Sequence, residues 1–272
     1  MTPEEHLKAG DPAAALKALQ DKVRADPADS RLRVFLFQLL CVLGDWKRAI
    51  AQLKLSAELD ELATMMAKTY REAIICEVYR EKVFAGEKDP LIFGEPQEWL
   101  ALLIEAQKTL ARGDAAKAAD LRARAFDAAP ACSGEVNGER FNWIADADMR
   151  LGPVLEIIVN GRYFWLPFSS IAALDIEPPS DLRDAVWTAA TLTLANGGEV
   201  VALIPTRYVG TTGAGDPAAL LARATSWTDC GGETFVGSGQ RLLTTDQADI
   251  ALMDIRSLKM DVPTTESAAG DG

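Results

Sequence analysis

The sequence predicts an α+β protein with a helical, repeat-containing domain over residues 1–130, a β-rich domain over residues 131–260 and a disordered tail over residues 261–272. Apolar residues recur at helical spacing in the first half, and a 34-residue repeat lies within that half. Aromatic and β-branched runs around Asn-Gly occur only in the second half. The chain has 272 residues, 49% of them hydrophobic, so it can bury a sizeable core.

Helix-start signals follow one another through the first half. Thr2 precedes Pro3 and Asp11 precedes Pro12, and each pair places an N-cap residue before a proline. Longer helices are expected over residues 62–85, 97–112 and 115–129. The spacing therefore predicts helices throughout residues 1–130.

These helices form a repeat. The Gly-Asp pair at residues 10–11 recurs at residues 44–45, and the small residue Ala15 recurs as Ala49. This is the period of the tetratricopeptide repeat (TPR), in which two helices approach closely at a small residue. A third Gly-Asp pair, at residues 113–114, begins a degenerate copy. We therefore expect a TPR-like stack with a groove for a peptide or helix, and a plain helical bundle is the alternative.

The second half carries strand and turn signals. The runs at residues 154–159 and 162–166 flank Asn160-Gly161, which predicts a hairpin with a two-residue turn. Further predicted elements are strands over 189–194 and 200–204 around a turn at 196–198, a strand near Leu242, a helix over 217–224, and a strand or helix over 248–258. Four tryptophans are expected to fill the core of this half: Trp143, Trp165, Trp187 and Trp227.

Composition argues against several functional classes. The net charge of −12 disfavours a nucleic-acid binder and a protein that docks on anionic lipid. The single histidine, His6, and four scattered cysteines disfavour a catalytic triad and a metal site, so no cofactor is expected. The sequence shows no signal peptide and no apolar run long enough for a membrane helix. These observations predict a cytoplasmic protein.

Two features could support catalysis. The glycines at residues 213 and 215 loosely match a dinucleotide-binding loop. However, Asp216 would repel a phosphate there, and Pro217 lacks the backbone N–H that would bind it. Asp146 and Asp148 form a carboxylate pair with Arg150 nearby, and we expect these three to be bonded within the protein. An enzyme whose site is built around Asp146, Asp148, Arg150 and Arg241 is the alternative to a binding protein.

Four motifs stand out in the second half: WIADAD at residues 143–148, RLGP at 150–153, NGRYFWLP at 160–167 and GSGQR at 237–241. Together they resemble the ImpE/TagJ family of type VI secretion accessory proteins, also called SciE-type virulence proteins. The resemblance implies a cytoplasmic bacterial adaptor without catalysis that binds the N-terminal helix of the sheath subunit TssB and is linked to the ATPase ClpV, which dismantles the sheath. It assigns a structural role to Trp143, Asp146, Asp148, Arg150, Tyr163, Trp165 and Arg241.

The repeat alignment predicts where such a helix binds. By analogy with other TPR proteins, the second repeat turns Arg31, Val34, Gln38 and Cys41 toward the concave side. The acidic net charge favours a basic helix and speeds its encounter at low salt. A scaffold that only stabilises another subunit is a third functional class that the sequence leaves open.

Overall fold

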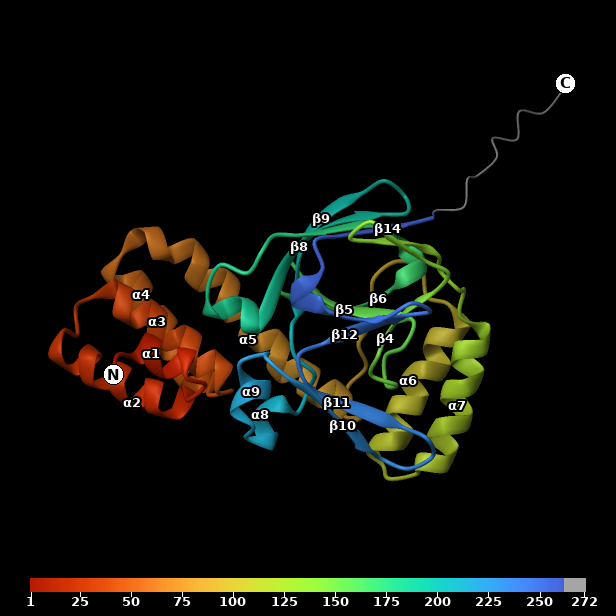
Figure 1. Cartoon of the computed structure of the whole chain (residues 1–272), viewed down its shortest axis with the longest axis horizontal. Helices are drawn as coiled ribbons and strands as arrows, with labels where there is room; N and C mark the ends of the chain where they lie inside the picture. Colours follow the sequence, from red (N-terminus) through yellow and green to blue (C-terminus); the bar gives the residue numbers. More distant parts are fainter. Residues whose placement is uncertain (262–272) are drawn as a thin grey trace, which may run out of the picture.

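The computed structural model describes residues 1–261 and divides into a helical arm and a strand-rich body (Figure 1). We call α1 to α5 the helical arm. Its members are α1 (Pro3–Lys8), α2 (Pro12–Ala25), α3 (Ser30–Val42), α4 (Trp46–Leu59) and α5 (Thr64–Phe84), with the short 3-10 helix η1 (Glu61–Ala63) before α5.

The arm has the predicted repeat. Asp11 caps α2 and Asp45 caps α4, each through its side-chain oxygen and a backbone N–H of the first turn. The preceding Gly10 and Gly44 have φ values of 83° and 75°, which a glycine adopts without strain. Ala15 and Ala49 are fully buried, as close packing of the two helices of a repeat requires. The α+β class and its TPR-like first part are confirmed.

After the helix pairs α1–α2 and α3–α4, α5 begins a third repeat, but no second helix completes that repeat within the arm. α5 starts 34 residues after α3 but continues past the position where a turn would end it. Its Tyr70 ring instead packs on Trp187 at 5.6 Å, and the Arg183 guanidinium lies over that ring at 4.8 Å. Trp187 belongs to β8 (Trp187–Leu194), and Arg183 belongs to the 3-10 helix η3 (Leu182–Ala185). The strand-rich body therefore caps the arm.

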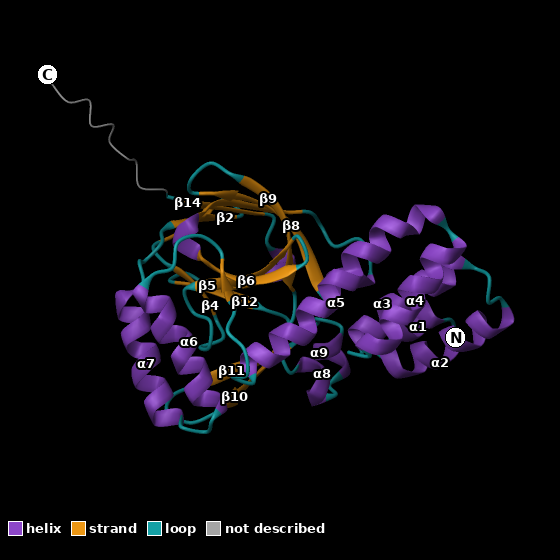
Figure 2. Cartoon of the chain, turned by 180° about the vertical axis from the view of Figure 1, so that it is seen from behind, coloured by secondary structure: helices purple, strands orange, loops and turns teal. Residues whose placement is uncertain are grey.

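The hairpin of α6 (Glu98–Ala111) and α7 (Ala115–Ala128) lies on the far side of the body from α1 to α4 (Figures 1 and 2). The predicted third Gly-Asp copy thus forms a helical hairpin but does not extend the stack. Arg122 replaces the apolar residue of the repeat and donates to the Gly232 carbonyl at 3.3 Å. The hairpin is therefore held by a loop of the body.

The body contains a nine-stranded sheet in the order β1-β6-β5-β9-β8-β7-β14-β2-β3. All its pairs are antiparallel except β1 with β6, and β5 meets β9 at the single pair Ile158 and Leu203. Its other strands are β1 (Leu91–Ile92), β2 (Gly134–Val136), β3 (Glu139–Phe141), β5 (Val154–Val159), β6 (Arg162–Pro167), β7 (Ile171–Ile176), β9 (Glu199–Pro205) and β14 (Ser257–Met260).

Smaller elements complete the body. A three-stranded sheet joins β4 (Ile144–Asp146), β12 (Leu242–Thr245) and β13 (Asp249–Ala251), and β10 (Thr225–Asp229) pairs with β11 (Phe235–Gly239). The short helices are η2 (Phe168–Ser170), α8 (Thr211–Ala214), α9 (Pro217–Leu220) and η4 (Leu252–Asp254).

The predicted hairpins are confirmed. Asn160 and Gly161 have φ values of 49° and 69°, as a two-residue turn between antiparallel strands requires. The second hairpin, β8–β9, turns at Gly197, whose φ is 83°.

Other local predictions need correction. The region 1–130 is not helical throughout, because residues 91–92 form β1 and add a strand to the sheet beside β6. The helix expected over 217–224 ends at Leu220, and the segment 248–258 contains two strands and a 3-10 helix instead of one element. Asp261 is held by Ser133 and Arg140, so the predicted tail does not begin there, and residues 262–272 lie outside the described part.

Two hydrophobic cores lie on opposite faces of β5. Leu155, Ile157 and Val159 face a core formed within the body, whereas Val154 and Ile158 belong to a core shared with the helical arm. The domain boundary at residue 130 stays a prediction.

No helix among residues 1–261 combines the length and apolar character needed to cross a membrane.

Candidate functional site

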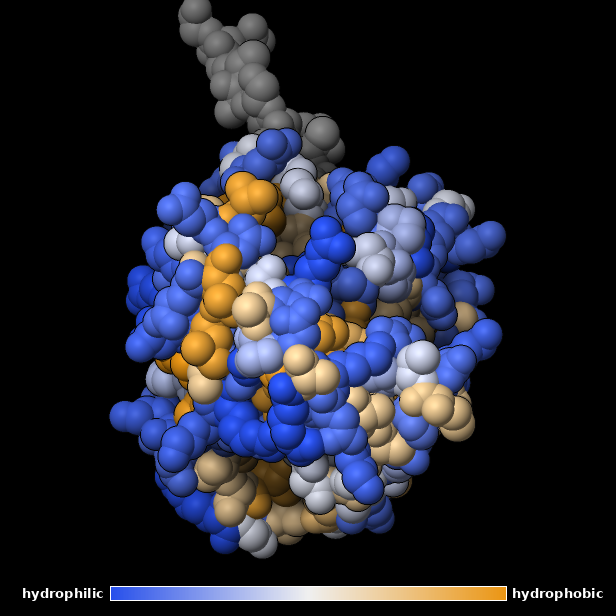
Figure 3. All heavy atoms as spheres, turned by 90° about the vertical axis from the view of Figure 1, so that its left-hand side faces the viewer, coloured by the Kyte–Doolittle hydropathy of each residue, from blue (hydrophilic) through white to orange (hydrophobic). Residues whose placement is uncertain are grey.

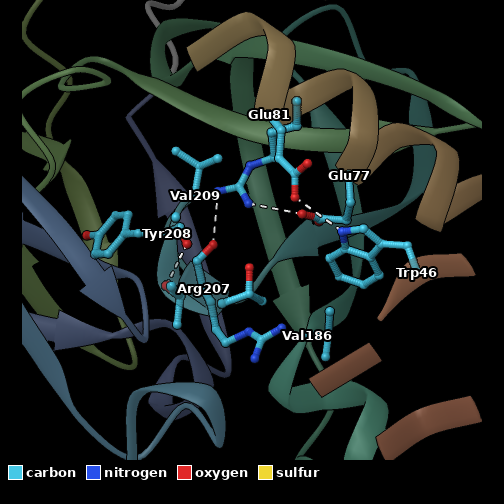
Figure 4. A pocket seen from close by; sticks show the side chains of 11 residues that line it. Trp46, Glu77, Glu81, Val186, Arg207, Tyr208 and Val209 are labelled. Atoms are coloured by element: carbon cyan, nitrogen blue, oxygen red, sulfur yellow. Dashed lines mark hydrogen bonds and ion pairs between the residues drawn. The ribbon is translucent and has the colours of Figure 1, made fainter. Parts of the chain in front are cut away.

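A small polar pocket lies where the helical arm meets the body (Figure 4). Trp46 and Glu77 reach it from α4 and α5, and the segment from Arg207 to Val209 faces them from the end of β9. The cavity measures about 20 Å³, which holds roughly one water molecule and no organic substrate.

Arg207 joins the two parts through backbone carbonyls. Its guanidinium donates to the carbonyls of Cys41 and Val42 at 3.2 and 2.7 Å, and to that of Leu220 at 2.6 Å. The first two carbonyls end α3, where the helix dipole favours a cation. Burial lowers the pKa of Arg207 to about 10, and the carboxylate of Glu77 offsets only part of this effect.

A buried ion network continues from this joint into the body. Arg80 of α5 binds Glu156 of β5 in a bidentate pair, at 2.6 and 2.9 Å. Arg241 also donates to Glu156, and its other guanidinium nitrogen donates to Asp146 of β4. Arg80, Glu156, Arg241 and Asp146 are all nearly inaccessible to solvent. The network thus ties the arm to two sheets of the body.

Aromatic side chains complete the hydrogen bonding of the network. The Tyr163 hydroxyl donates to Glu156 and accepts from the Trp165 indole at 2.7 Å. The Trp187 indole donates to Glu77 at 3.0 Å, and Glu77 also accepts from Arg80 at 3.2 Å. Each buried charge therefore has several partners, which is the condition under which a buried ion network is tolerated.

The pKa values of two network carboxyl groups move in opposite directions. Burial alone would raise the pKa of Glu156, but the guanidinium groups of Arg80 and Arg241 outweigh it and lower the pKa to about 2. Burial raises the pKa of Asp146 to about 7 despite the contact with Arg241. The network therefore strongly favours the ionised form of Glu156.

This predicts a loss of stability in acid. The contribution of ionised Glu156 is present above pH 4.5, its ordinary pKa, and is lost as the pH falls toward 2. The full shift corresponds to about 3 kcal/mol. Denaturant unfolding of the wild type and Glu156→Gln between pH 2 and 5 measures this effect, because Asp146 is present in both proteins. The stability difference between the two should shrink in acid, and a constant difference would contradict the assignment.

The paired aspartates and Arg150 are bonded within the protein, as predicted. Asp148 accepts from Arg150 through both carboxylate oxygens, at 2.9 and 2.5 Å, and from the Gly237 amide at 2.9 Å. Asp146 accepts from the Asp148 amide at 2.8 Å. Asp146, Asp148 and Arg241 are all buried, so they do not line an open pocket together.

The tryptophan prediction is half wrong. Trp165 and Trp187 are buried at the joint, but Trp143 and Trp227 are each about 40% exposed. The Trp227 ring packs at a tilt against Tyr208, with the ring centres 5.6 Å apart. Trp143 immediately precedes β4, an edge strand of the three-stranded sheet.

The predicted groove residues of α3 are only partly accessible. Arg31 is exposed and Val34 is half-buried. Gln38 and Cys41 are buried, and the Cys41 carbonyl is a partner of Arg207. The body covers the end of α3, so Gln38 and Cys41 cannot form the floor of an open groove in this structure.

Sequence reasoning missed Glu77, Arg80, Glu156 and Arg207 as members of the network. One signal was available for Glu156, because a single charge inside the apolar run of residues 154–159 requires a buried partner. Its partner Arg80 lies 76 residues away, and nothing local identifies it.

Among residues 1–261, no group of three or more His, Cys, Asp or Glu side chains is arranged to hold a metal ion.

Comparisons with known proteins agree with this architecture. Residues 6–68 match the tetratricopeptide repeat model, and residues 138–259 match the model described as ImpE protein. A Pseudomonas aeruginosa protein named type VI secretion system accessory component TagJ is 53% identical over 261 residues, which cover 96% of this chain and 92% of that protein. This chain belongs to the ImpE/TagJ family.

The family resemblance of the sequence motifs is thereby confirmed. The ImpE match contains Asp146, Glu156 and Arg241, whereas Arg80 of the network lies outside both matched regions. A crystal structure of a Vibrio parahaemolyticus protein superimposes with a TM-score of 0.85 at 24% identity, over 95% of this chain and 97% of that one. The arm and body thus form a fold already seen by crystallography.

Proposed function

We propose that this protein is a non-catalytic accessory component of a type VI secretion system. In this role it acts in the cytoplasm as an adaptor that binds the N-terminal helix of the sheath subunit TssB. Binding modulates sheath assembly or the ClpV-driven disassembly of the sheath. The observation that carries the proposal is the 53% identity over 96% of the chain to a protein named as such an accessory component.

The architecture supports a binding role. TPR-like helices serve in many proteins as surfaces for peptides and helices. Of the polar side chains that sequence analysis considered for catalysis, Asp146, Asp148 and Arg241 are buried, and the half-buried Arg150 is bonded to Asp148. The pocket beside the network holds about one water molecule. Acid-base chemistry on a substrate needs these groups within reach of it. These features favour an adaptor over an enzyme.

Binding to the cognate TssB tests the proposal. The full chain should bind purified TssB and a labelled peptide that copies its first helix, measured by fluorescence anisotropy. Deleting that helix from TssB should abolish the interaction. If the wild-type chain binds neither probe at low salt, the TssB part of the proposal is wrong. A change in the rate at which ClpV dismantles sheaths, on addition of the chain, would test the modulating role.

A further inference from the structure

One face of the helical arm carries an unusual row of exposed side chains. Figure 3 views the molecule from the end of the arm, and hydrophobic side chains interrupt the charged surface there. Leu62 is 91% exposed, Met65 73% and Ile75 48%. Lys68, Glu72 and Tyr79 continue this row at spacings of three or four, so the residues from Met65 onward share one face of α5, and Leu62 precedes them in η1. We call them the α5 stripe.

An apolar cavity lies beside the C-terminal end of the stripe. It measures about 200 Å³, enough for one large apolar side chain. Ile75, Cys76 and Tyr79 form its α5 wall, and Leu91 and Tyr163 form the opposite wall. Leu91 belongs to β1, the edge strand of the large sheet. The arm and the body thus build the cavity together.

The stripe occupies the binding positions of the TPR-like array. Moving the predicted concave residues of α3 by one 34-residue repeat leads to Met65, Lys68, Glu72 and Ile75. Gln38 and Cys41 are buried, whereas their counterpart Glu72 is half-buried and their counterpart Ile75 is exposed. The concave face is therefore accessible along α5, whereas on α3 its C-terminal part is buried.

The local charge of this surface is opposite to that of the chain. On the stripe face of α5, Lys68 and Lys82 are exposed and Glu72 is half-buried. Within residues 1–261, none of these three side chains forms an ion pair. The two unpaired lysines favour acidic side chains on the occupant. This differs from the basic helix that the net charge of −12 favours.

We propose that the α5 stripe and its cavity are the docking site for an amphipathic helix with acidic flanks, the helix being that of the sheath subunit. The inference rests on the proposed function and adds the surface to it. From Met65 to Ile75 the stripe is about 15 Å long, three turns of helix. A helix laid along it presents anchors at i, i+3 or i+4, and i+7, one of which enters the cavity. The α5 part of the site offers no edge for strand pairing, because the backbone groups in the middle of a helix are bonded within it.

Three variants of the full chain test the site by anisotropy with the labelled TssB helix peptide. Ile75→Glu places a charge at the cavity mouth and should weaken binding by at least tenfold. Val201→Glu is the matched control, since Val201 is 75% exposed on β9 in the body and should leave binding within twofold. The double variant Lys68→Glu/Lys82→Glu should weaken binding and reduce its dependence on salt. Circular dichroism and thermal unfolding establish that each variant is folded.

The outcomes separate the two proposals. Loss of binding in Ile75→Glu, with binding retained in Val201→Glu, supports the α5 site. Wild-type binding that Ile75→Glu leaves unchanged overturns the site and leaves the adaptor function intact. Equal weakening by both variants also overturns the site, because it reveals no preference for α5. Absence of wild-type binding to both TssB and its peptide overturns the TssB interaction and the site that rests on it.

Discussion

Replacing Arg241 with methionine should lower the free energy of unfolding by about 3–5 kcal/mol, the usual cost of removing one partner from a buried ion pair. Arg241 is fully buried and donates to Asp146, Glu156 and the Pro205 carbonyl. Methionine fills a similar length but leaves two carboxylates without this partner. Urea unfolding followed by circular dichroism measures the loss.

The matched control is Arg140→Met. Arg140 also binds a carboxylate, that of Asp261, but its side chain is 62% exposed and water can replace the interaction. Its loss should cost much less than the loss of Arg241, because exposed ion pairs contribute little to stability. Similar costs for the two variants would show that the buried network contributes no more than a surface pair. A double variant that also carries Asp146→Asn should recover part of the loss, because one of the two unpaired charges is removed.

Replacing Arg207 with methionine should cost about 2–4 kcal/mol, because three buried carbonyls each lose a charged donor, although that of Cys41 keeps the Gly44 amide. These are the carbonyls of Cys41, Val42 and Leu220, and the first two belong to the arm. The helical arm should therefore open more often in relation to the body. Relative to the wild type, amide hydrogen exchange should accelerate more in α3 than in β5. Denaturant unfolding should give the total loss in the free energy of unfolding.

Arg33→Met is the control for this second prediction. Arg33 donates to the Pro27 carbonyl at 3.2 and 3.0 Å, so it makes the same kind of contact, but within the arm and near solvent. Its loss should cost about 1 kcal/mol or less, with no selective change in exchange. An Arg207→Met protein whose exchange rates rise equally in arm and body would contradict the role of Arg207 as the joint.

Local features of the fold could be predicted from the sequence because local rules govern them. The hairpin at Asn160-Gly161 and the helix starts at Asp11 and Asp45 depend on residues within a few positions of one another. Strand β1 could not be found in this way. Its two residues carry no period, and they form a strand only because β6 lies beside them.

The network could be predicted only in part, for a related reason. Asp148 and Arg150 are two residues apart and their pairing follows from proximity. Arg80 meets Glu156 across 76 residues, a contact that the tertiary packing of α5 on the sheet creates. The accessibility of α3 was mispredicted because the repeat alignment describes an isolated array. It contains no information about the body, whose Arg207 binds the Cys41 carbonyl at the buried end of α3.

The joint at Arg207 has an evolutionary consequence. Every amino acid supplies a carbonyl, so the contacts of Arg207 with residues 41 and 42 place no demand on the identity of those side chains. The pair of Arg80 and Glu156, in contrast, ties two side chains of opposite charge. The identities of residues 41 and 42 are therefore limited by packing, since both side chains are fully buried, and not by the contact with Arg207. A change at position 80 would leave Glu156 without one of its buried partners unless position 156 changed with it. The two joints thus place different demands on the sequence at the boundary between the arm and the body.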